Sequence, residues 1–206
     1  MRILKNEHNE EKAIFRTPVE LFINLKKKIM PLIKTVDPKE ATGKVAGIYE
    51  HFTNKFGFVP NAFKLTSSSE FLLQQQVNSL GYYMQHPTIS NRLQAFIRML
   101  VSIDKNCEYC VNMNTGLLLN SGLSIEQIET AKKNPAEAPL EPKEIEMLLF
   151  VLKVVNNPKA VNEADLNKLR SLGWQDSEIM EASFQGASQV ASDTIFEAFK
   201  IENDQM

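Results

Sequence analysis

Helix-start signals recur along this chain and leave little room for other secondary structure. Each signal is a capping residue followed three positions later by an acid or amide that can reach back to a free backbone N–H. The signals stand at Thr17–Glu20, Asp37–Glu40, Ser67–Glu70 and Ser124–Gln127, and the first two add proline at the first helical position. Apolar residues at helical spacing follow them, and no stretch alternates polar and apolar residues over the length of a strand. The sequence therefore predicts an all-α fold.

The apolar spacing also predicts where the core helices lie. A stripe that includes Phe96 and Leu100 follows Ser90. Residues 145–155 are apolar nearly all round, which is typical of a buried central helix. A last long helix is expected from about residue 176 to residue 199. These segments account for most of a helical core.

Glycine and proline residues separate the periodic segments at intervals suited to short interhelical connections. Within the last helix, the small residues of Ala182–Ser188 let a neighbouring element approach closely. We predict one all-helical domain over residues 17–206. Residues 1–16 are polar and lack a periodic stripe, so we expect an N-terminal arm outside the core.

Composition supports a single packed domain and excludes several partners. The 206 residues are 43% apolar and 23% charged, near the average for globular proteins. With 23 basic against 25 acidic residues, the chain lacks the positive surplus of a nucleic-acid binder. The first ten residues hold no apolar signal core, and the longest apolar run, Met147–Leu152, is too short to span a bilayer. We therefore expect a cytoplasmic protein with no nucleic-acid or membrane partner.

The chain has two cysteines, Cys107 and Cys110, separated by two residues. A bridge between them would close a very small ring, and the stabilisation expected from a disulfide grows with the size of its loop. In a reducing compartment such a pair is more often a switchable dithiol than a structural link. The spacing thus indicates thiol chemistry.

The predicted position of the pair favours reactivity. Residues 102–106 are expected to form a turn that ends in Asn106 as the N-cap, with Asp104 also available as a cap, before a helix that runs to about Asn120. Free N–H groups and the positive dipole end of a helix lower the pKa of a thiol in its first turn. Such a thiolate can attack a peroxide or a disulfide, and the second thiol can resolve the product. Glu108 opposes this effect because its carboxylate disfavours a second negative charge.

Other interpretations of the cysteine pair are less well supported. A zinc site needs about four ligands, whereas the remaining candidates are three widely separated histidines. Covalent haem would need histidine directly after Cys110, where Val111 stands. The plainest alternative is two small buried apolar residues on one helix face. We expect no metal and no organic cofactor.

Other titratable residues are expected to play ordinary roles. His51 lies in an apolar-striped helix and His86 precedes a proline, so each is more simply a surface or capping histidine than a base for the thiols. Tyr82, Tyr83 and Tyr109 are expected to be packing aromatics.

Several motifs together resemble the carboxymuconolactone decarboxylase family, and within it the alkylhydroperoxidase D-like branch. They are Gly57–Asn61, Val101–Ser102 with Cys107–Val111, Ser121–Ser124 and Leu140–Glu144. The resemblance covers roughly residues 38–200 in the same order and spacing. It implies a helical bundle of the alkylhydroperoxidase D-like type, a dithiol that reduces peroxides or exchanges disulfides, and a homo-oligomer such as a dimer, trimer or hexamer.

The resemblance also implies residue roles. The second cysteine of the family attacks peroxide and the first resolves, which assigns these roles to Cys110 and Cys107. Family members usually carry histidine four residues after the second cysteine and glutamate twelve residues before the first. Here these positions hold Asn114 and Ala95, with Gln94 beside the latter. None of these side chains accepts a proton at neutral pH.

The sequence therefore favours a thiol-dependent peroxidase or disulfide oxidoreductase that acts in antioxidant defence, with an external dithiol as reductant. Two alternatives remain open. Loss of the proton relay is also compatible with a redox sensor that does not turn over, or with an oligomeric binding protein. Lactone decarboxylation, the activity that names the family, lacks an obvious set of acid and base groups.

Overall fold

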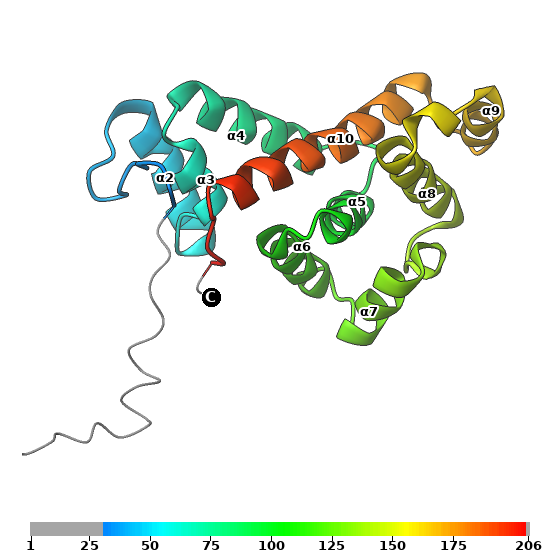
Figure 1. Cartoon of the computed structure of the whole chain (residues 1–206), viewed down its shortest axis with the longest axis horizontal. Coiled ribbons are helices and arrows are strands. Elements are labelled where there is room, and N and C mark those ends of the chain that lie inside the picture. Colours follow the sequence, from blue (N-terminus) through cyan, green and yellow to red (C-terminus); the bar gives the residue numbers. More distant parts are fainter. Residues whose placement is uncertain (1–30, 205–206) are drawn as a thin grey trace, which may run out of the picture.

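The computed structural model describes residues 31–204, and within this range all regular secondary structure is helical (Figure 1). The all-α prediction is confirmed. The expected arm at residues 1–16 and the helix start at Thr17 lie outside the described residues. The α-helices are α2 (Gly43–Phe56), α3 (Asn61–Thr66), α4 (Glu70–Met84), α5 (Asn91–Asp104), α6 (Glu108–Asn120), α7 (Ile125–Lys133), α8 (Pro142–Asn156), α9 (Glu163–Ser171) and α10 (Asp176–Ala198). Two short 3₁₀ segments are η1 (Pro135–Glu137) and η2 (Pro158–Ala160).

The α5 helix lies at the centre, against α6, α8 and α10 (Figure 1). Its predicted stripe is buried: Phe96 and Ile97 are inaccessible to solvent. The α8 helix contributes Met147, Leu148 and Val151 to the same core, as its nearly continuous apolar sequence predicts. Because an apolar stripe is removed from water only when another element covers it, α5 and α8 specify this core together.

A second core lies between the N-terminal helices and the ends of α6 and α10. The α2–α4 region contributes Phe52, Phe63 and Leu73, and α10 contributes Phe196. Both cysteines belong to this second core. The dithiol is thus placed among apolar side chains at the junction of elements that are far apart in the sequence.

The helix-start signals are partly confirmed. Ser124 is an N-cap and forms a complete capping box with Gln127. Ser90, which precedes the predicted stripe but was not among the signals, is the N-cap of α5. The signal at Ser67–Glu70 is displaced: Ser69 caps α4. The signal at Asp37 is wrong as a helix start, because its carboxylate accepts the Lys39 N–H in a turn that precedes α2.

The long α10 helix packs closely on α8 at Gly186, inside the predicted small-residue stretch. An added Cβ at Gly186 would lie 2.5 Å from Val151 Cγ1, so the contact is with α8 side chains. The opposite face of α10 leaves Met180 and Phe184 largely exposed, and the exposed residues from Met180 to Ile195 carry no charge. No helix in the described range has the length and hydropathy required to cross a bilayer.

Candidate active site

The connection between α5 and α6 places both cysteines. The Cys107 N–H donates to the Ser102 carbonyl at 3.0 Å, and the Asn106 N–H donates to the Ile103 carbonyl at 3.1 Å. With Asn106 at a left-handed φ of 56°, this is a Schellman motif that ends α5. Its last residue, Cys107, is also the N-cap of α6. Asn106 is therefore not the cap of α6, and the expected position is off by one residue.

The dithiol occupies the first turn of α6, as predicted. Cys107 is the N-cap and Cys110 lies three residues along the helix. Both are free thiols and both are completely buried. A carboxylate from α10 joins them: the two sulfurs and a carboxylate oxygen of Asp193 lie within 4.8 Å of one another.

Asp193 is held by one of its two oxygens. Oδ1 accepts hydrogen bonds from Ser102 Oγ at 2.9 Å and from Gln189 Nε2 at 2.7 Å. Gln189 Nε2 also approaches Ser102 Oγ at 3.1 Å, which ties the three residues together. Oδ2 has no hydrogen-bond partner, although Asp193 is only 1% exposed. A buried, unpaired carboxylate oxygen is costly and points to a functional role.

The sequence analysis did not identify Asp193. A signal was available, because Gln185, Gln189 and Asp193 recur every four residues along α10 and are all buried there. Polar side chains on the buried face of a helix require partners or a function. The contact with α5 spans 91 positions of the sequence, so helical periodicity could indicate burial but not the partner.

The surroundings of Cys110 favour the neutral thiol. The pKa of Cys110 is raised by its hydrogen-bonding contact with Cys107, by burial, and by the negative charge of Asp193. This contradicts the expectation of a lowered pKa at the helix start. The free N–H groups of α6 are present, but the contact with Cys107, removal from water and the adjacent carboxylate outweigh them.

A half-buried cation, Arg98, also interacts electrostatically with Cys110. Burial lowers the pKa of Arg98 to about 10, while its attraction to Cys110 acts in the opposite direction. Arg98 Nε donates to Asn114 Oδ1 at 2.8 Å, and Asn114 Nδ2 donates to the Cys110 carbonyl at 2.8 Å. Asn114, in the position of the expected histidine, thus orients Arg98. Sequence reasoning missed Arg98 as well.

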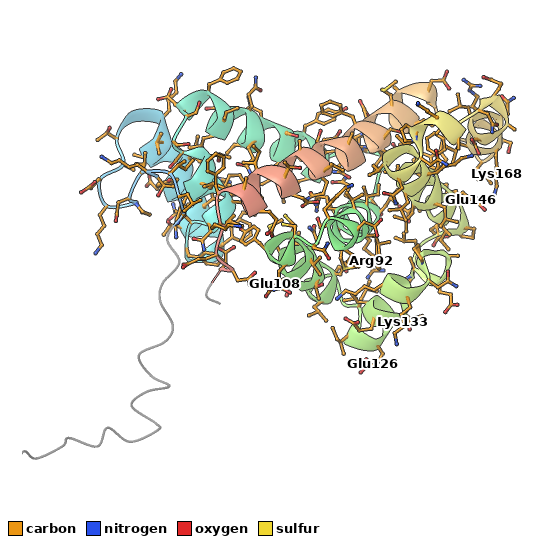
Figure 2. All side chains as sticks on the ribbon, viewed as in Figure 1. Arg92, Glu108, Glu126, Lys133, Glu146 and Lys168 are labelled. Atoms are coloured by element: carbon orange, nitrogen blue, oxygen red, sulfur yellow. The ribbon has the colours of Figure 1, made fainter. Side chains whose placement is uncertain are left out.

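Glu108, which was expected to oppose the thiolate, and Ala95 and Gln94 at the relay position lie apart from the sulfurs. Glu108 is exposed at the outer side of α6, where it accepts hydrogen bonds from Asn112 and Asn203 (Figure 2). Ala95, on α5, is buried in the hydrophobic core that α5 forms with α8. Gln94 donates to the carbonyls of Tyr83 and Ile89.

The histidines and tyrosines occupy other sites. His51 is exposed and packs edge-on against Phe52. His86 Nδ1 accepts the Ile89 N–H at 2.9 Å, so Nε2 carries the proton that is shared with Glu181 at 2.7 Å. His86 therefore holds the loop before α5 and does not face the thiols as a base; it caps no helix, since the N-cap of α5 is Ser90.

Glu181 also accepts from the Tyr82 hydroxyl at 2.7 Å, and its backbone carbonyl accepts from Tyr83 at 2.9 Å. Tyr109 is buried and donates to Asp204 at 2.8 Å. Asp104, considered as a cap, instead accepts from Asn156 at 2.8 Å.

Metal-ligating groups are limited to one cluster among residues 31–204. Cys107, Cys110 and Asp193 would offer three donors. A structural zinc centre takes four protein ligands. The set is one donor short, and we do not assign these residues to a metal.

The fold of this chain is similar to that of several solved structures, although its sequence is not close to that of known families. No protein-family model matches the sequence, and no curated protein matches it significantly. Solved structures do match. A peroxidase-related protein from Silicibacter sp. TM1040 has a TM-score of 0.76 at 22% identity, with 86% of this chain and 93% of that chain covered. The alkylhydroperoxidase AhpD core of a peroxidase-related protein from Ralstonia eutropha JMP134 has a TM-score of 0.76 at 19% identity, with 85% and 93% covered.

This chain has the AhpD core fold. The fold predicted from the resemblance is therefore confirmed. The AhpD core also supports a different named activity: the debrominase Bmp8, solved as a cysteine-to-alanine variant in complex with 2,3,4-tribromopyrrole, has a TM-score of 0.63 at 14% identity, with 87% of this chain and 93% of that chain covered. Because one fold carries several reactions, the reaction of this chain has to be argued from its own residues.

Proposed function

We propose that this protein is a thiol-dependent oxidoreductase that reduces alkyl hydroperoxides, with Cys110 as the attacking and Cys107 as the resolving residue. The observation that carries the proposal is the buried Cys107–Cys110 pair in the first turn of α6, within the AhpD core fold. The AhpD core structure is described as peroxidase-related, which supports the same class of reaction.

The proposed reaction needs no bound cofactor. The Cys110 sulfur attacks one peroxide oxygen, the O–O bond breaks, and the alcohol leaves with the thiol proton, so the sulfur becomes a sulfenic acid. The Cys107 sulfur then attacks Cys110, the S–O bond breaks, and water leaves with the second thiol proton. A disulfide remains, and an external dithiol reduces it by exchange.

Arg98 fits this scheme as a cation whose charge acts on the attacking sulfur. Its guanidinium attracts negative charge on Cys110, and Asn114 fixes its orientation. Charge that develops on sulfur and oxygen in the transition state is stabilised most effectively by a cation that is already in place. Arg98 therefore takes over the electrostatic part of a site that lacks the histidine.

Substrate access requires a local opening. Both sulfurs are buried. A cavity of about 370 Å³ between α8, α9 and α10 is lined by residues that include Phe150, Arg170 and Met180, and the thiols do not line it. The thiols are covered by side chains of α2–α4 and α10. Openings of this kind cost less than global unfolding, so we expect slow oxidation that is limited partly by exposure of the pair.

The decisive experiment counts free thiols before and after addition of one equivalent of cumene hydroperoxide. We expect the wild-type protein to lose both thiols. The C107S variant should stop at a sulfenic acid that dimedone traps on Cys110, whereas C110S should resist oxidation. If both wild-type thiols remain titratable, the proposal is wrong.

A second measurement separates an enzyme from a sensor that does not turn over. The buried sulfurs and the raised pKa of Cys110 favour a slow reaction, which is the property expected of a sensor. With excess dithiothreitol and hydroperoxide, an enzyme forms many equivalents of alcohol per protein above the rate of the uncatalysed mixture. A single equivalent would identify the sensor.

A further inference from the structure

We propose that Asp193 is a catalytic residue that transfers the protons of the dithiol, in place of the absent histidine and glutamate relay. This inference rests on the proposed thiol chemistry and names the group that completes it. Asp193 comes from α10, outside the α5–α6 segment that carries the sequence motif.

The geometry places Asp193 beside the dithiol. One carboxylate oxygen of Asp193 lies within 4.8 Å of both sulfurs, and the sulfurs lie within the same distance of each other. Ser102 and Gln189 both donate to Oδ1, which fixes the carboxylate and leaves Oδ2 without a hydrogen-bond partner. The side chain is therefore held by one oxygen while the other is available for a proton.

The other candidate acids and bases are engaged elsewhere or cannot accept a proton. Among residues 31–204, Glu108 is exposed and bonds to Asn203, and His86 is engaged with Glu181. Asn114 and Ala95 have no group that accepts a proton at neutral pH. The carboxylate of Asp193 is thus the proton acceptor that the described structure places beside the sulfurs.

The charged and titratable groups that face Cys110 come from several elements. Cys107 lies in the same turn of α6, Arg98 comes from α5, and Asp193 comes from α10. Tyr109 is adjacent in sequence, but its hydroxyl donates to Asp204. Asp193 therefore supplies the negative charge of this group and Arg98 supplies the positive charge.

The proposed proton transfers balance in each step. As the Cys110 sulfur bonds to a peroxide oxygen, Asp193 accepts its proton and returns it to the departing alkoxide, which leaves as the alcohol. As the Cys107 sulfur attacks the sulfenic acid, Asp193 accepts the second proton and returns it to hydroxide, which leaves as water. The peroxide is reduced by two electrons, the sulfur pair is oxidised by two electrons, and the carboxylate is regenerated.

This role agrees with a thiol that is neutral at rest. A carboxylate next to a thiol disfavours the thiolate at equilibrium, yet it assists ionisation during the attack because it accepts the proton as the new bond forms. Asp193 is therefore expected to have opposite effects on two reactions. It should slow alkylation, whose rate depends on the thiolate present at equilibrium, and it should accelerate hydroperoxide reduction.

The test is the Asp193→Asn variant, whose Oδ1 retains the acceptor for both Ser102 and Gln189. Stopped-flow oxidation by cumene hydroperoxide should become at least about tenfold slower, since general acid–base groups contribute about 10²–10⁴-fold. Alkylation of the same thiols by iodoacetamide at pH 8 should become faster. Both reagents require the same exposure of the thiols, so a change in opening would shift the two rates together.

Glu108→Gln is the matched control, because it removes one negative charge from the same turn of α6 without contact to the sulfurs. Both of its rates should equal those of the wild type. If D193N speeds both reactions, Asp193 acts only through its charge. If D193N leaves both rates unchanged, Asp193 takes no part in either reaction. Either result overturns the inference. If the wild type does not react with hydroperoxide at all, the proposed function itself fails.

A measurement on the wild-type protein covers the case in which D193N does not fold. Proton transfer to Asp193 during the attack predicts slower hydroperoxide oxidation in D₂O than in H₂O. Attack by a thiolate formed in advance predicts an equal or faster rate in D₂O, and that result would also overturn the inference.

Discussion

Because α8 and α10 are in close contact at Gly186, we predict that one added methyl group there lowers the stability of the fold. In a Gly186→Ala variant the new Cβ would lie 2.5 Å from Val151 Cγ1 and 3.1 Å from Val155 Cγ2. Carbon atoms pack favourably at about 3.5–4.0 Å, so both contacts are too short. Valine has one strongly preferred χ1 rotamer in a helix, which prevents these methyl groups from turning away.

Two opposing contributions determine how much Gly186→Ala changes the free energy of unfolding. Alanine stabilises a helix interior by about 0.5–1 kcal/mol relative to glycine. Overpacking a well-packed core costs about 1–3 kcal/mol. We expect Gly186→Ala to lower the free energy of unfolding by about 1–2 kcal/mol, close to the difference between the central values of these two ranges.

The measurement is urea denaturation followed by circular dichroism. Gly47→Ala is the control, because Gly47 is exposed in α2 and an added Cβ would meet nothing within 4 Å. That control should be more stable than the wild type by about 0.5–1 kcal/mol. Asp193 lies two turns beyond Gly186 on the same face of α10. A displacement of α10 in G186A should therefore also move Asp193 and slow thiol oxidation. If G186A is as stable as G47A, the reasoning about this contact is refuted.

Further predictions concern the site, the pH dependence of stability and the oligomer. Asn114→His should speed thiol oxidation near pH 7 in stopped-flow traces, because a titratable group then stands one turn from Cys110; an unchanged rate would mean that proton removal does not limit the reaction. The pKa of Glu181 is lowered, mainly by the hydrogen bond from Tyr82, so its stabilising effect is complete above its ordinary pKa of about 4.3 and is lost at lower pH. Glu181→Gln should therefore reduce the urea midpoint at pH 7, and the difference from the wild type should shrink near pH 3. The wild type should form a homo-oligomer that Phe184→Glu weakens, because Phe184 and Met180 are 62% and 68% exposed on an uncharged face of α10; light scattering that finds the same oligomer in both would contradict this assignment of the interface.

Local patterns predicted the helices because helix starts and apolar stripes are determined by neighbouring residues. Ser90 and Ser124 act as caps, and α10 begins at Asp176 as expected. The signal at Asp37 failed since its carboxylate is satisfied within a turn before the helix starts. Cys107 lies within one residue of its expected place because Asn106 ends the preceding helix instead of capping the next.

The composition of the candidate site was less predictable because it depends on contacts between distant segments. The spacing of the two cysteines indicated the dithiol, and the resemblance supplied their roles and identified Asn114 and Ala95 as departures from the usual relay. Ser102 and Asp193 are separated by 91 positions, and their contact requires α10 to cross α5. A single sequence reveals the buried face of α10 but not the helix that it covers.

The raised pKa of Cys110 shows why reasoning from the helix start alone predicted a pKa shift in the wrong direction. A helix N-terminus stabilises an anion by about 0.3–1 kcal/mol, which is less than one pKa unit at about 1.36 kcal/mol per unit. Full burial opposes ionisation by as much as about 3–5 units. Cys110 has both features. Its pKa is raised first by the hydrogen-bonding contact with Cys107 in the same turn, then by burial and by the negative charge of Asp193, and together these outweigh the helix N-terminus. Under the proposed function a buried dithiol of this kind needs a group that accepts its protons, and Asp193 from α10 is the carboxylate that lies within 4.8 Å of both sulfurs.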